Sequence, residues 1–425
     1  MPESDFITAQ LTPEPADWRR KAGQALIACG TMLALFALLI FGLTIERLWL
    51  FVGLIVVVVA VAIFYHRSPD MRAKLEQAFR ASRASVLILL IALLAAYPLI
   101  LSRDPYLIHI GALSAIYVIM ALGLNITLGF AGLLDIGFAV YYGAGAYMSA
   151  QLAINFGVSF WLGLLLGGLT AAFFGFLVAW PALRVHDHYL GLVTLGYGLM
   201  MNLLARNLAF LTNGTDGVIN IPPPAIGTHA FTEPLSLGPL TLPFQANFYY
   251  LAVTLALVTA FISYRLRQSS LGRAWDAIRE DEIAARCAGV DARGVKVLAF
   301  STGAFFGGIG GAIYAHMIGF IGPENFTFLE SITILVMVVM GGAGNIAGVT
   351  IGAIILVVLP ERFREFEHLR LLFFGIALVL LMINRPEGIF PRTRTRRLLP
   401  SDKLTAAATG RGALPLPSLS RIDPT

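Results

Sequence analysis

"LIHIGALSAIYVIMALGLNITL", residues 107–128, is a run of mostly apolar residues without a single Asp, Glu, Lys or Arg. A helix needs about 20 such residues to cross the roughly 30 Å hydrocarbon core of a bilayer, so this stretch is long enough to span a membrane. Similar runs recur along the chain, near residues 25–43, 48–65, 86–101, 130–151, 158–180, 190–210, 246–264, 297–320, 329–341, 345–360 and 371–384. The chain is 57% hydrophobic and 13% charged, with a mean hydropathy of +0.78. These features predict an all-α polytopic membrane protein with about 10–12 hydrophobic segments.

Basic residues indicate how these segments are oriented, because cytoplasmic loops of membrane proteins carry an excess of Lys and Arg. Four basic clusters lie before the first run, between the second and third, after the eighth and after the last: Arg19, Arg20 and Lys21; Arg67, Arg72, Lys74, Arg80 and Arg83; the basic residues of 265–296; and Arg392, Arg394, Arg396 and Arg397. Counting crossings places all four clusters on one side, which is predicted to be the cytoplasm. The long 211–245 loop then lies on the opposite side.

Two glycine-rich stretches interrupt the apolar pattern. The segments 329–341 and 345–360 are too short to span comfortably and flank "GGAGN", which predicts broken or re-entrant helices. A similar break occurs at "LGFAGLLDIG", residues 128–137, and the two breaks either mark half-repeats or match by chance. Irregular backbone at membrane depth is tolerated only where protein or a water-filled path surrounds it. The candidate residues of a translocation path are therefore Asn125, Gly129, Gly132, Asp135, Gly341, Gly344 and Asn345.

Asp135 lies inside the predicted span 130–151, where a carboxylate is costly and is a candidate for ion coupling or substrate contact. Its place near the cytoplasmic end, at the glycine-rich break, favours a second interpretation, in which it is hydrated or hydrogen-bonded there. Asn125, Thr127 and Asn345 likewise either line a path or form hydrogen bonds between helices. The sequence favours the structural role for these three residues without deciding it.

The segment "SLGRAWDAIREDEIAARCAGVD", residues 270–291, differs from the rest of the chain. Residues 265–296 hold twelve of the 55 charged residues, which are 30 Lys and Arg plus 25 Asp and Glu. Ser270 is a candidate helix cap, Gly289 a candidate terminator and Asp291 a candidate cap for the next helix, which predicts one helix of about eighteen residues outside the bilayer. Small side chains fall on one side of that helix, at Ala274, Ala277, Ala284, Ala285 and Ala288. This side either docks into a cleft of another protein or belongs to a solvated loop.

The part "GRAWDAIREDEIAARCAGV" resembles the cytoplasmic coupling segment of permease subunits in ATP-binding-cassette (ABC) importers, with an E-x-A-A-x-x-x-G core. More narrowly, the chain resembles branched-chain amino acid permeases, in particular the larger of the two permease subunits. The resemblance covers roughly residues 107–390 and includes "GLNITLGFAGLLDIGFAVYYGAGAY", "HYLGLVTLGYG", "LTNGTDGVINIPPP" and "GFIGPENFTFLESITILVMVVMGGAGN". The chain departs from the family pattern at Asp135 and at His186-Asp187-His188.

The resemblance implies an ABC importer permease fold in the bacterial inner (plasma) membrane. It implies a cytoplasmic tail over 1–24, extra transmembrane spans over 25–106, a permease core over 107–390 with its coupling loop at 265–296, and a disordered cytoplasmic tail over 391–425. The implied partners are a second homologous permease, two ATPase subunits and a periplasmic substrate-binding protein. The residues implied in ATPase coupling are Arg273, Glu280, Asp281, Glu282, Ala284, Ala285 and Gly289.

Several other functions find little support in the sequence. None of the four lysines follows a glycine, so the chain has no G-x-x-x-x-G-K-[ST] phosphate loop, and any ATP is expected to be used by partner subunits. No catalytic residues, cofactor site or nucleic-acid footprint are predicted. No metal site is predicted either, because the "HDH" turn offers too few ligands. Two alternatives to branched-chain amino acid import stay open. One is a permease for urea or short amides, and the other is an ion-coupled secondary amino acid transporter that uses Asp135.

Overall fold

The structure of the protein is a computed structural model that describes residues 15–44, 53, 77–79, 81–182, 188–227, 229–237, 240–362, 375, 379 and 388–390. Most of the predicted segments 48–65 and 371–384, the His186-Asp187 turn and the predicted tail 391–425 lie outside the described residues.

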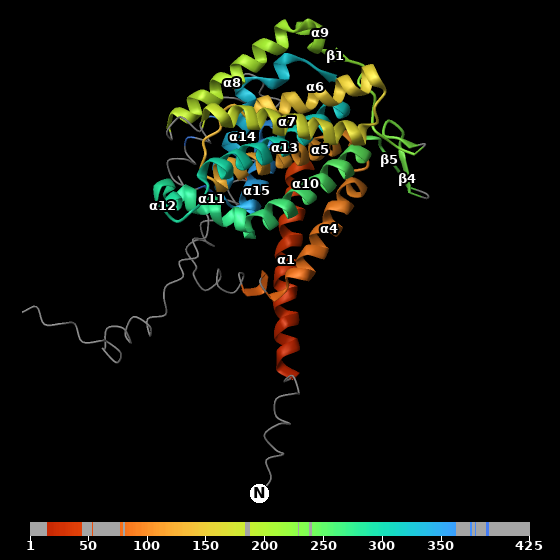
Figure 1. The fold of residues 1–425 in the computed structure, drawn as a ribbon. Helices are drawn as coiled ribbons and strands as arrows, with labels where there is room; N and C mark the ends of the chain where they lie inside the picture. Colours follow the sequence, from red (N-terminus) through yellow and green to blue (C-terminus); the bar gives the residue numbers. More distant parts are fainter. Residues whose placement is uncertain are drawn as a thin grey trace, which may run out of the picture. The chain divides into compact units, whose positions relative to one another are not determined.

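The described chain is mainly helical (Figure 1). Its α-helices are α1 (Pro15–Thr44), α4 (Arg83–Ile100), α5 (Pro105–Leu124), α6 (Ala139–Phe156), α7 (Phe160–Ala182), α8 (His188–Asn207), α9 (Ala209–Thr212), α10 (Gln245–Gln268), α11 (Ser270–Glu280), α12 (Glu282–Cys287), α13 (Ala292–Ile318), α14 (Phe328–Gly341) and α15 (Ile346–Arg362). A π-helix, η3 (Asn125–Phe130), continues α5, and two 3-10 turns are η4 (Gly214–Asp216) and η5 (Pro323–Phe326).

Five described helices are long and apolar enough to cross a membrane, which confirms the polytopic class. They are Gly23–Gly42, Pro105–Phe130, Phe160–Pro181, Gln245–Gln268 and Ala292–Ile318. Shorter apolar helices are Ala84–Ile100, Phe328–Gly341 and Ile346–Glu361. Helix α1 begins at Pro15, inside the predicted tail 1–24, and its large side chains stay exposed along the bilayer-length stretch, as at Leu26 and Leu35. Helix α4 packs against it.

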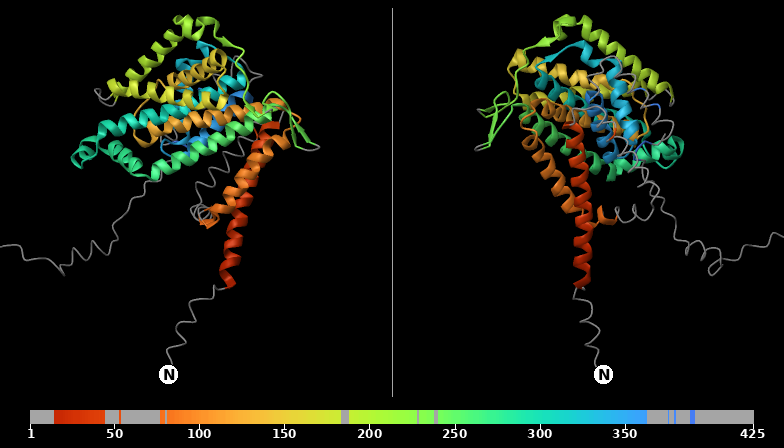
Figure 2. Two further views of the ribbon diagram at one scale, coloured as in Figure 1. Left: turned by 45° about the vertical axis from the view of Figure 1, so that its right-hand side comes forward. Right: turned by 180° about the vertical axis from the view of Figure 1, so that it is seen from behind.

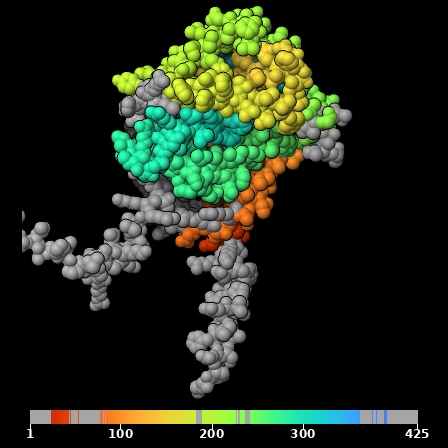
Figure 3. All heavy atoms as spheres, in the orientation of Figure 1, coloured from red at the N-terminus to blue at the C-terminus, as the bar shows by residue number. Residues whose placement is uncertain are grey.

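Helix α13 is the centre of the bundle, packed against α5, α6 and α7 (Figure 1). Glycines of α13 let the backbone of α6 approach closely. A Cβ atom on Gly311 would lie only 2.0 Å from the carbonyl oxygen of Tyr142 in α6. Without a hydrophobic driving force between helices in lipid, such small residues increase van der Waals packing by letting backbones touch. Figure 3 shows α7 and α8, in yellow and lime, next to each other on one face of the molecule.

Three short antiparallel strand pairs form at one end of the bundle, and the sequence analysis did not predict them. They are β1 (Val218–Ile219) with β6 (Phe320–Ile321), β2 (Ala225–Ile226) with β3 (His229–Ala230), and β4 (Leu235–Leu237) with β5 (Leu240–Leu242). The first pair joins the 211–245 loop to the segment after α13, with Val218 opposite Ile321. Two- and three-residue strands carry no readable periodicity, which explains why they were missed.

The strand pairs and the charged segment lie at opposite ends of the bundle (Figures 1 and 2). Helix α10 connects them directly, because it starts just after β5 and ends just before α11. This arrangement agrees with the predicted topology, in which 211–245 and 265–296 face opposite sides of the membrane. A spanning helix of 24 residues therefore separates the two ends.

Candidate functional site

The two glycine-rich breaks predicted from the sequence contact each other. Helix α5 passes at Asn125 into the π-helical turn η3, a form that occurs often at functional sites. The side-chain oxygen of Asn125 accepts the backbone N–H of Gly344, at 2.7 Å. Gly129 lies at the same contact, since a Cβ atom there would be 2.5 Å from the Gly344 nitrogen. Residues far apart in sequence thus form one buried junction.

The second break is a tight turn between two packed helices. Helix α14 ends at Gly341, and the turn that follows places Gly342 at φ 102° and Gly344 at φ 90°, where a Cβ atom is disfavoured. Asn345 then accepts the N–H of Gly348 through its side-chain oxygen, at 3.3 Å, and donates to the Phe390 carbonyl, at 3.1 Å. The prediction of a broken pair at 329–341 and 345–360 is confirmed.

Asp135 lies in a non-helical connection, which agrees with the predicted glycine-rich break at 128–137, although the following helix starts later than the predicted segment 130–151. Helix α6 begins only at Ala139, after Gly132 has taken φ 73°. The Asp135 carboxylate is fully buried, and one oxygen accepts the N–H of Gly137 at 3.1 Å. Its other oxygen has no hydrogen-bond partner among the described residues. One oxygen of Asp135 is therefore hydrogen-bonded, as the second interpretation expected, and the choice between that interpretation and a role in ion coupling or substrate contact stays a prediction.

Glu330 is a second acidic side chain within an apolar segment, and the sequence analysis passed over it. It lies in the first turn of α14, inside the predicted segment 329–341, and accepts a hydrogen bond from the Tyr117 hydroxyl of α5. The rule that singled out Asp135, that a carboxylate within an apolar run is unusual, applies equally to Glu330. The pair ties α14 to α5 close to the strand end of the bundle.

The charged segment forms two helices rather than the single helix predicted. Asp281 ends α11 with an extended backbone, and its carboxylate accepts the N–H groups of Ile283 (2.8 Å) and Ala284 (3.0 Å) as the N-cap of α12. Aspartate is a strong N-cap because its side chain satisfies amides that a helix start leaves unpaired. The cap of α11 is Ser269, one residue before the predicted one.

The predicted end of the segment is confirmed. Gly289 takes φ 87°, the left-handed conformation that terminates many helices. Asp291 caps α13 by accepting the N–H of Arg293, at 3.2 Å. Arg273 holds the start of α11, where it donates to the Ser270 hydroxyl at 2.9 Å. Glu280 is exposed at the other end of the same helix.

Helix α11 lies directly on the first break. Trp275 is fully buried, its indole N–H donates to the Val295 carbonyl at 2.9 Å, and its ring stacks on Phe130 of η3 with centroids 6.5 Å apart. The guanidinium of Arg279 donates to the Gly129 carbonyl. The same side chain packs on Gly132, where a Cβ atom would lie 2.7 Å from its Cγ. The sequence analysis missed these contacts, although Trp275 and Ile278 have the spacing of a buried helical stripe.

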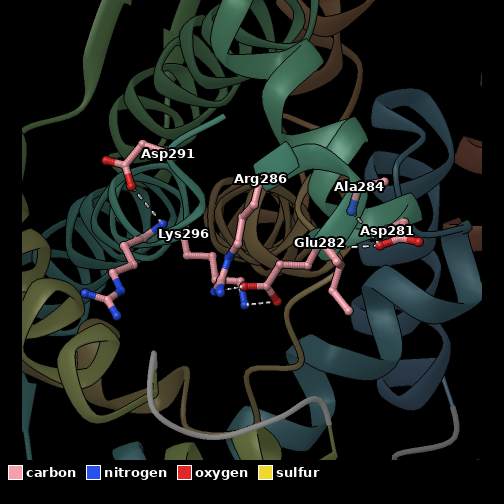
Figure 4. Close-up of polar contacts among 8 residues, drawn as sticks. Asp281, Glu282, Ala284, Arg286, Asp291 and Lys296 are labelled. Carbon is pink, nitrogen blue, oxygen red and sulfur yellow. Dashed lines mark hydrogen bonds and ion pairs between the residues drawn. The ribbon is translucent and has the colours of Figure 1, made fainter. Parts of the chain in front are cut away.

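Helix α12 is attached to α13 by an ion pair (Figure 4). Glu282 contacts Arg286 at 2.5 Å and Lys296 of α13 at 2.6 Å. Partial burial alone would raise the pKa of Glu282, but the hydrogen bond and charge of Lys296, with those of Arg286, outweigh it and lower that pKa. The carboxylate is therefore ionised at neutral pH.

The predicted alanine side is divided between the two surfaces of α12. Ala285 is 5% exposed and faces this chain, so the expectation that it lies on a docking surface is wrong. Ala284 and Ala288 are exposed, together with Cys287 and with Ile283, which is 76% exposed. Spacing along a helix shows which residues share a side, but not which side the rest of the fold covers. We call Ile283, Ala284, Cys287 and Ala288 the outer face of α12.

Comparison with known proteins places this architecture in a family. The family model described as "Branched-chain amino acid transport system / permease component" matches residues 106–382, which include both breaks and the charged segment. The chain belongs to this permease family. The permease is 39% identical over 320 residues to the high-affinity branched-chain amino acid transport system permease protein LivM of Escherichia coli K12, covering 72% of this chain and 75% of that protein.

Two further relatives extend the comparison. The LivM protein of Salmonella typhimurium LT2 is 37% identical over 329 residues, covering 74% of the permease and 76% of that protein. The permease protein LivH of the same organism is 24% identical over 298 residues, covering 67% of the permease and 94% of that protein. No solved structure matches the permease. All three relatives are named as permease proteins of a high-affinity branched-chain amino acid transport system.

Proposed function

We propose that the protein is the transmembrane permease subunit of an ABC importer that moves branched-chain amino acids into the cytoplasm. The observation that supports this most is the two-sided form of the charged segment. Helix α12 presents an outer face that nothing in the described chain covers, while α11 rests on the π-helical break. A segment that binds a partner on one side and contacts the membrane core on the other is suited to transmit movement.

The proposed transmission follows contacts between neighbouring residues. A force on α12 moves α11, because the two helices share Asp281 as the end of one and the cap of the other. Helix α11 is joined to η3 through Arg279 and Gly129, and η3 to the second break through Asn125 and Gly344. Both breaks can therefore shift together when α11 shifts. In this mechanism the candidate path residues are the moving parts between inward and outward access.

The proposed assembly follows from the family and from the two ends of the bundle. LivH shows that the family includes a second permease, which would complete the pathway. Two partner ATPases would bind the outer faces of the coupling helices and hydrolyse ATP, while the permease itself holds no cofactor. A periplasmic binding protein would dock on the end where β1 and β6 join the 211–245 loop to the 321–328 loop.

Reconstitution tests this function directly. The permease, assembled with its second permease and ATPases in liposomes, is supplied with binding protein on one side and ATP on the other, without an ion gradient. We expect ATP-dependent accumulation of leucine. If the permease alone accumulates leucine under an ion gradient, and Asp135→Asn abolishes that uptake, the secondary transporter replaces the importer.

A further inference from the structure

A cavity of ≈ 240 Å³ lies between α6, α7 and α8, in the half of the bundle nearest the strand end. Its walls are almost entirely apolar and include Ala144 and Met148 of α6, Phe174 of α7, Met201 and Ala205 of α8, and Leu208 between α8 and α9. Sites for drug-sized ligands usually measure about 300–1,000 Å³, so this volume suits a smaller molecule. None of the contacts of the coupling segment involves this cavity.

Polar groups in the cavity wall are occupied, with one exception. Asn202 donates to the carbonyls of Pro323 (2.6 Å) and Phe326 (3.2 Å), and the Thr212 hydroxyl donates to the Ala205 carbonyl (2.6 Å). The hydroxyl of Tyr147 is buried and has no hydrogen-bond partner among the described residues. Buried hydroxyls are nearly always hydrogen-bonded, so the Tyr147 hydroxyl is available to bind a polar group of a molecule in the cavity.

Two residues of opposite charge lie close to Asn202, which is part of the cavity wall. Arg206 donates through Nε to the Asn202 side-chain oxygen, at 3.0 Å. Asn202 also binds the carbonyls of Pro323 and Phe326, so the turn that carries Glu324 lies against the same asparagine. Both charged side chains are exposed, and neither forms an ion pair within the part of the chain that the structure describes.

We propose that this cavity binds a branched-chain amino acid on its way in from the strand end, an inference that rests on the proposed import function. The aliphatic side chain of the amino acid fills the apolar cavity. Its ammonium group binds the Glu324 carboxylate, its carboxylate binds the guanidinium of Arg206, and the Tyr147 hydroxyl gains a hydrogen-bond partner. An apolar pocket with a cationic and an anionic residue close to one of its wall residues matches a zwitterion with an aliphatic side chain.

A lipid acyl chain is the competing occupant, because the walls alone would accept one. An acyl chain, however, would leave the Tyr147 hydroxyl without a partner and would not use the opposite charges of Arg206 and Glu324. Charge complementarity therefore favours the amino acid. A lipid chain found in the cavity would overturn the proposal.

Photolabelling tests the site without relying on transport. The assembled importer in nanodiscs is illuminated with photo-leucine, a diazirine analogue of leucine, and labelled peptides are identified by mass spectrometry. We expect labels on α6 and α8 around Met148 and Ala205, reduced at least about tenfold by excess leucine. Labelling that excess leucine does not reduce, or specific labelling of the permease only elsewhere, contradicts the proposal.

Substitutions at one wall provide a matched test. Ala205→Trp fills the cavity, whereas Leu203→Trp places the same side chain on the exposed side of α8, where Leu203 is 59% exposed. We expect leucine uptake to fall at least about tenfold in the first variant and less than about twofold in the second, with equal ATPase retention. If wild type imports leucine and Ala205→Trp does so equally well, the cavity assignment fails while the import function stands. If the wild-type importer does not import leucine, the proposed import function itself is contradicted.

A smaller change keeps the test valid if Ala205→Trp does not fold. Ala205→Leu shortens the cavity without filling it, so uptake of valine should suffer less than uptake of leucine. We expect the ratio of leucine to valine uptake to fall about threefold or more, since one methylene in an apolar pocket commonly changes selectivity by about tenfold or more. An unchanged ratio, with the variant folded and active, overturns the proposal.

Discussion

Helices α11 and α12 adjoin in sequence but differ in what covers their apolar side chains. In α11, Trp275 is 0% exposed and Ile278 is 6% exposed, and both face the bundle. In α12, Ile283 is 76% exposed, and only Ala285 is buried. The charged segment therefore has two halves. The inner half, α11, packs on the break at η3, and the outer half, α12, presents a face that is available to a partner. Substitutions in the two halves should therefore fail in different ways.

Trp275→Ala should have the largest effect, and the effect should be on the permease itself. Removing the ring leaves a cavity against Phe130 and removes the hydrogen bond to the Val295 carbonyl. Phe or Trp to Ala changes in a core cost about 3–5 kcal/mol, so we expect a lower melting temperature and reduced abundance in the membrane. Ile283→Ala is the matched control and should leave both unchanged. Equal stability of the two variants would abolish the distinction between the halves.

Replacing either of two neighbouring alanines of α12 by tryptophan should give the next largest effect. Ala285→Trp should overpack the interface of α12 with this chain and cost about 1–3 kcal/mol of permease stability. Ala284→Trp, one residue earlier and exposed, should leave stability unchanged but weaken co-purification of the ATPases and leucine uptake. Melting curves and pull-down from detergent measure both. If Ala284→Trp retains the ATPases and full uptake, the outer face of α12 is not the docking surface.

The ion pair of Glu282 should give the smallest effect, and the effect should depend on pH. A lowered carboxyl pKa means that the pair stabilises the fold above the ordinary value of 4.5, and that this stability is lost as the pH falls through the lowered value. Exposed pairs contribute about 0.2–1 kcal/mol. We expect Glu282→Gln to lower the melting temperature slightly at pH 7, and to have no such effect at a lower pH, below the lowered pKa of Glu282. A difference that persists undiminished at the lower pH would argue against the pair as its cause.

Local chemistry explains which parts of this site could be predicted from the sequence. Gly289 and Asp291 were predicted as terminator and cap because helix ends depend on residues within one turn. The interruption at Asp281 was missed, although aspartate is as good a cap there as at Asp291. The burial of Ala285 was not predictable, because α12 has two similar sides and only the position of α13 decides which is covered.

In the transmembrane part, contacts between residues far apart in sequence could not be predicted. The glycine breaks at 129–132 and 341–344 were predicted separately, and their composition indicated irregular backbone. Their contact through Asn125 and Gly344 joins positions 219 residues apart, which no local pattern encodes. Five predicted apolar segments, 25–43, 107–128, 158–180, 246–264 and 297–320, correspond to helices that can span a membrane, because a run of apolar residues long enough to cross a bilayer is visible in the sequence.

In the proposed mechanism, movement of α11 is transmitted to the π-helical break η3 through Arg279. Arg279→Met removes the hydrogen bond to the Gly129 carbonyl and keeps most of the aliphatic packing on Gly132. The measurement is ATP hydrolysis and leucine uptake by the same assembled importer in liposomes, with Arg293→Met, at an exposed position at the start of α13, as the control. We predict that Arg279→Met keeps its ATPases and hydrolyses ATP at near wild-type rates, while uptake per ATP falls about tenfold or more. A wild-type ratio of uptake to hydrolysis in Arg279→Met would contradict the account.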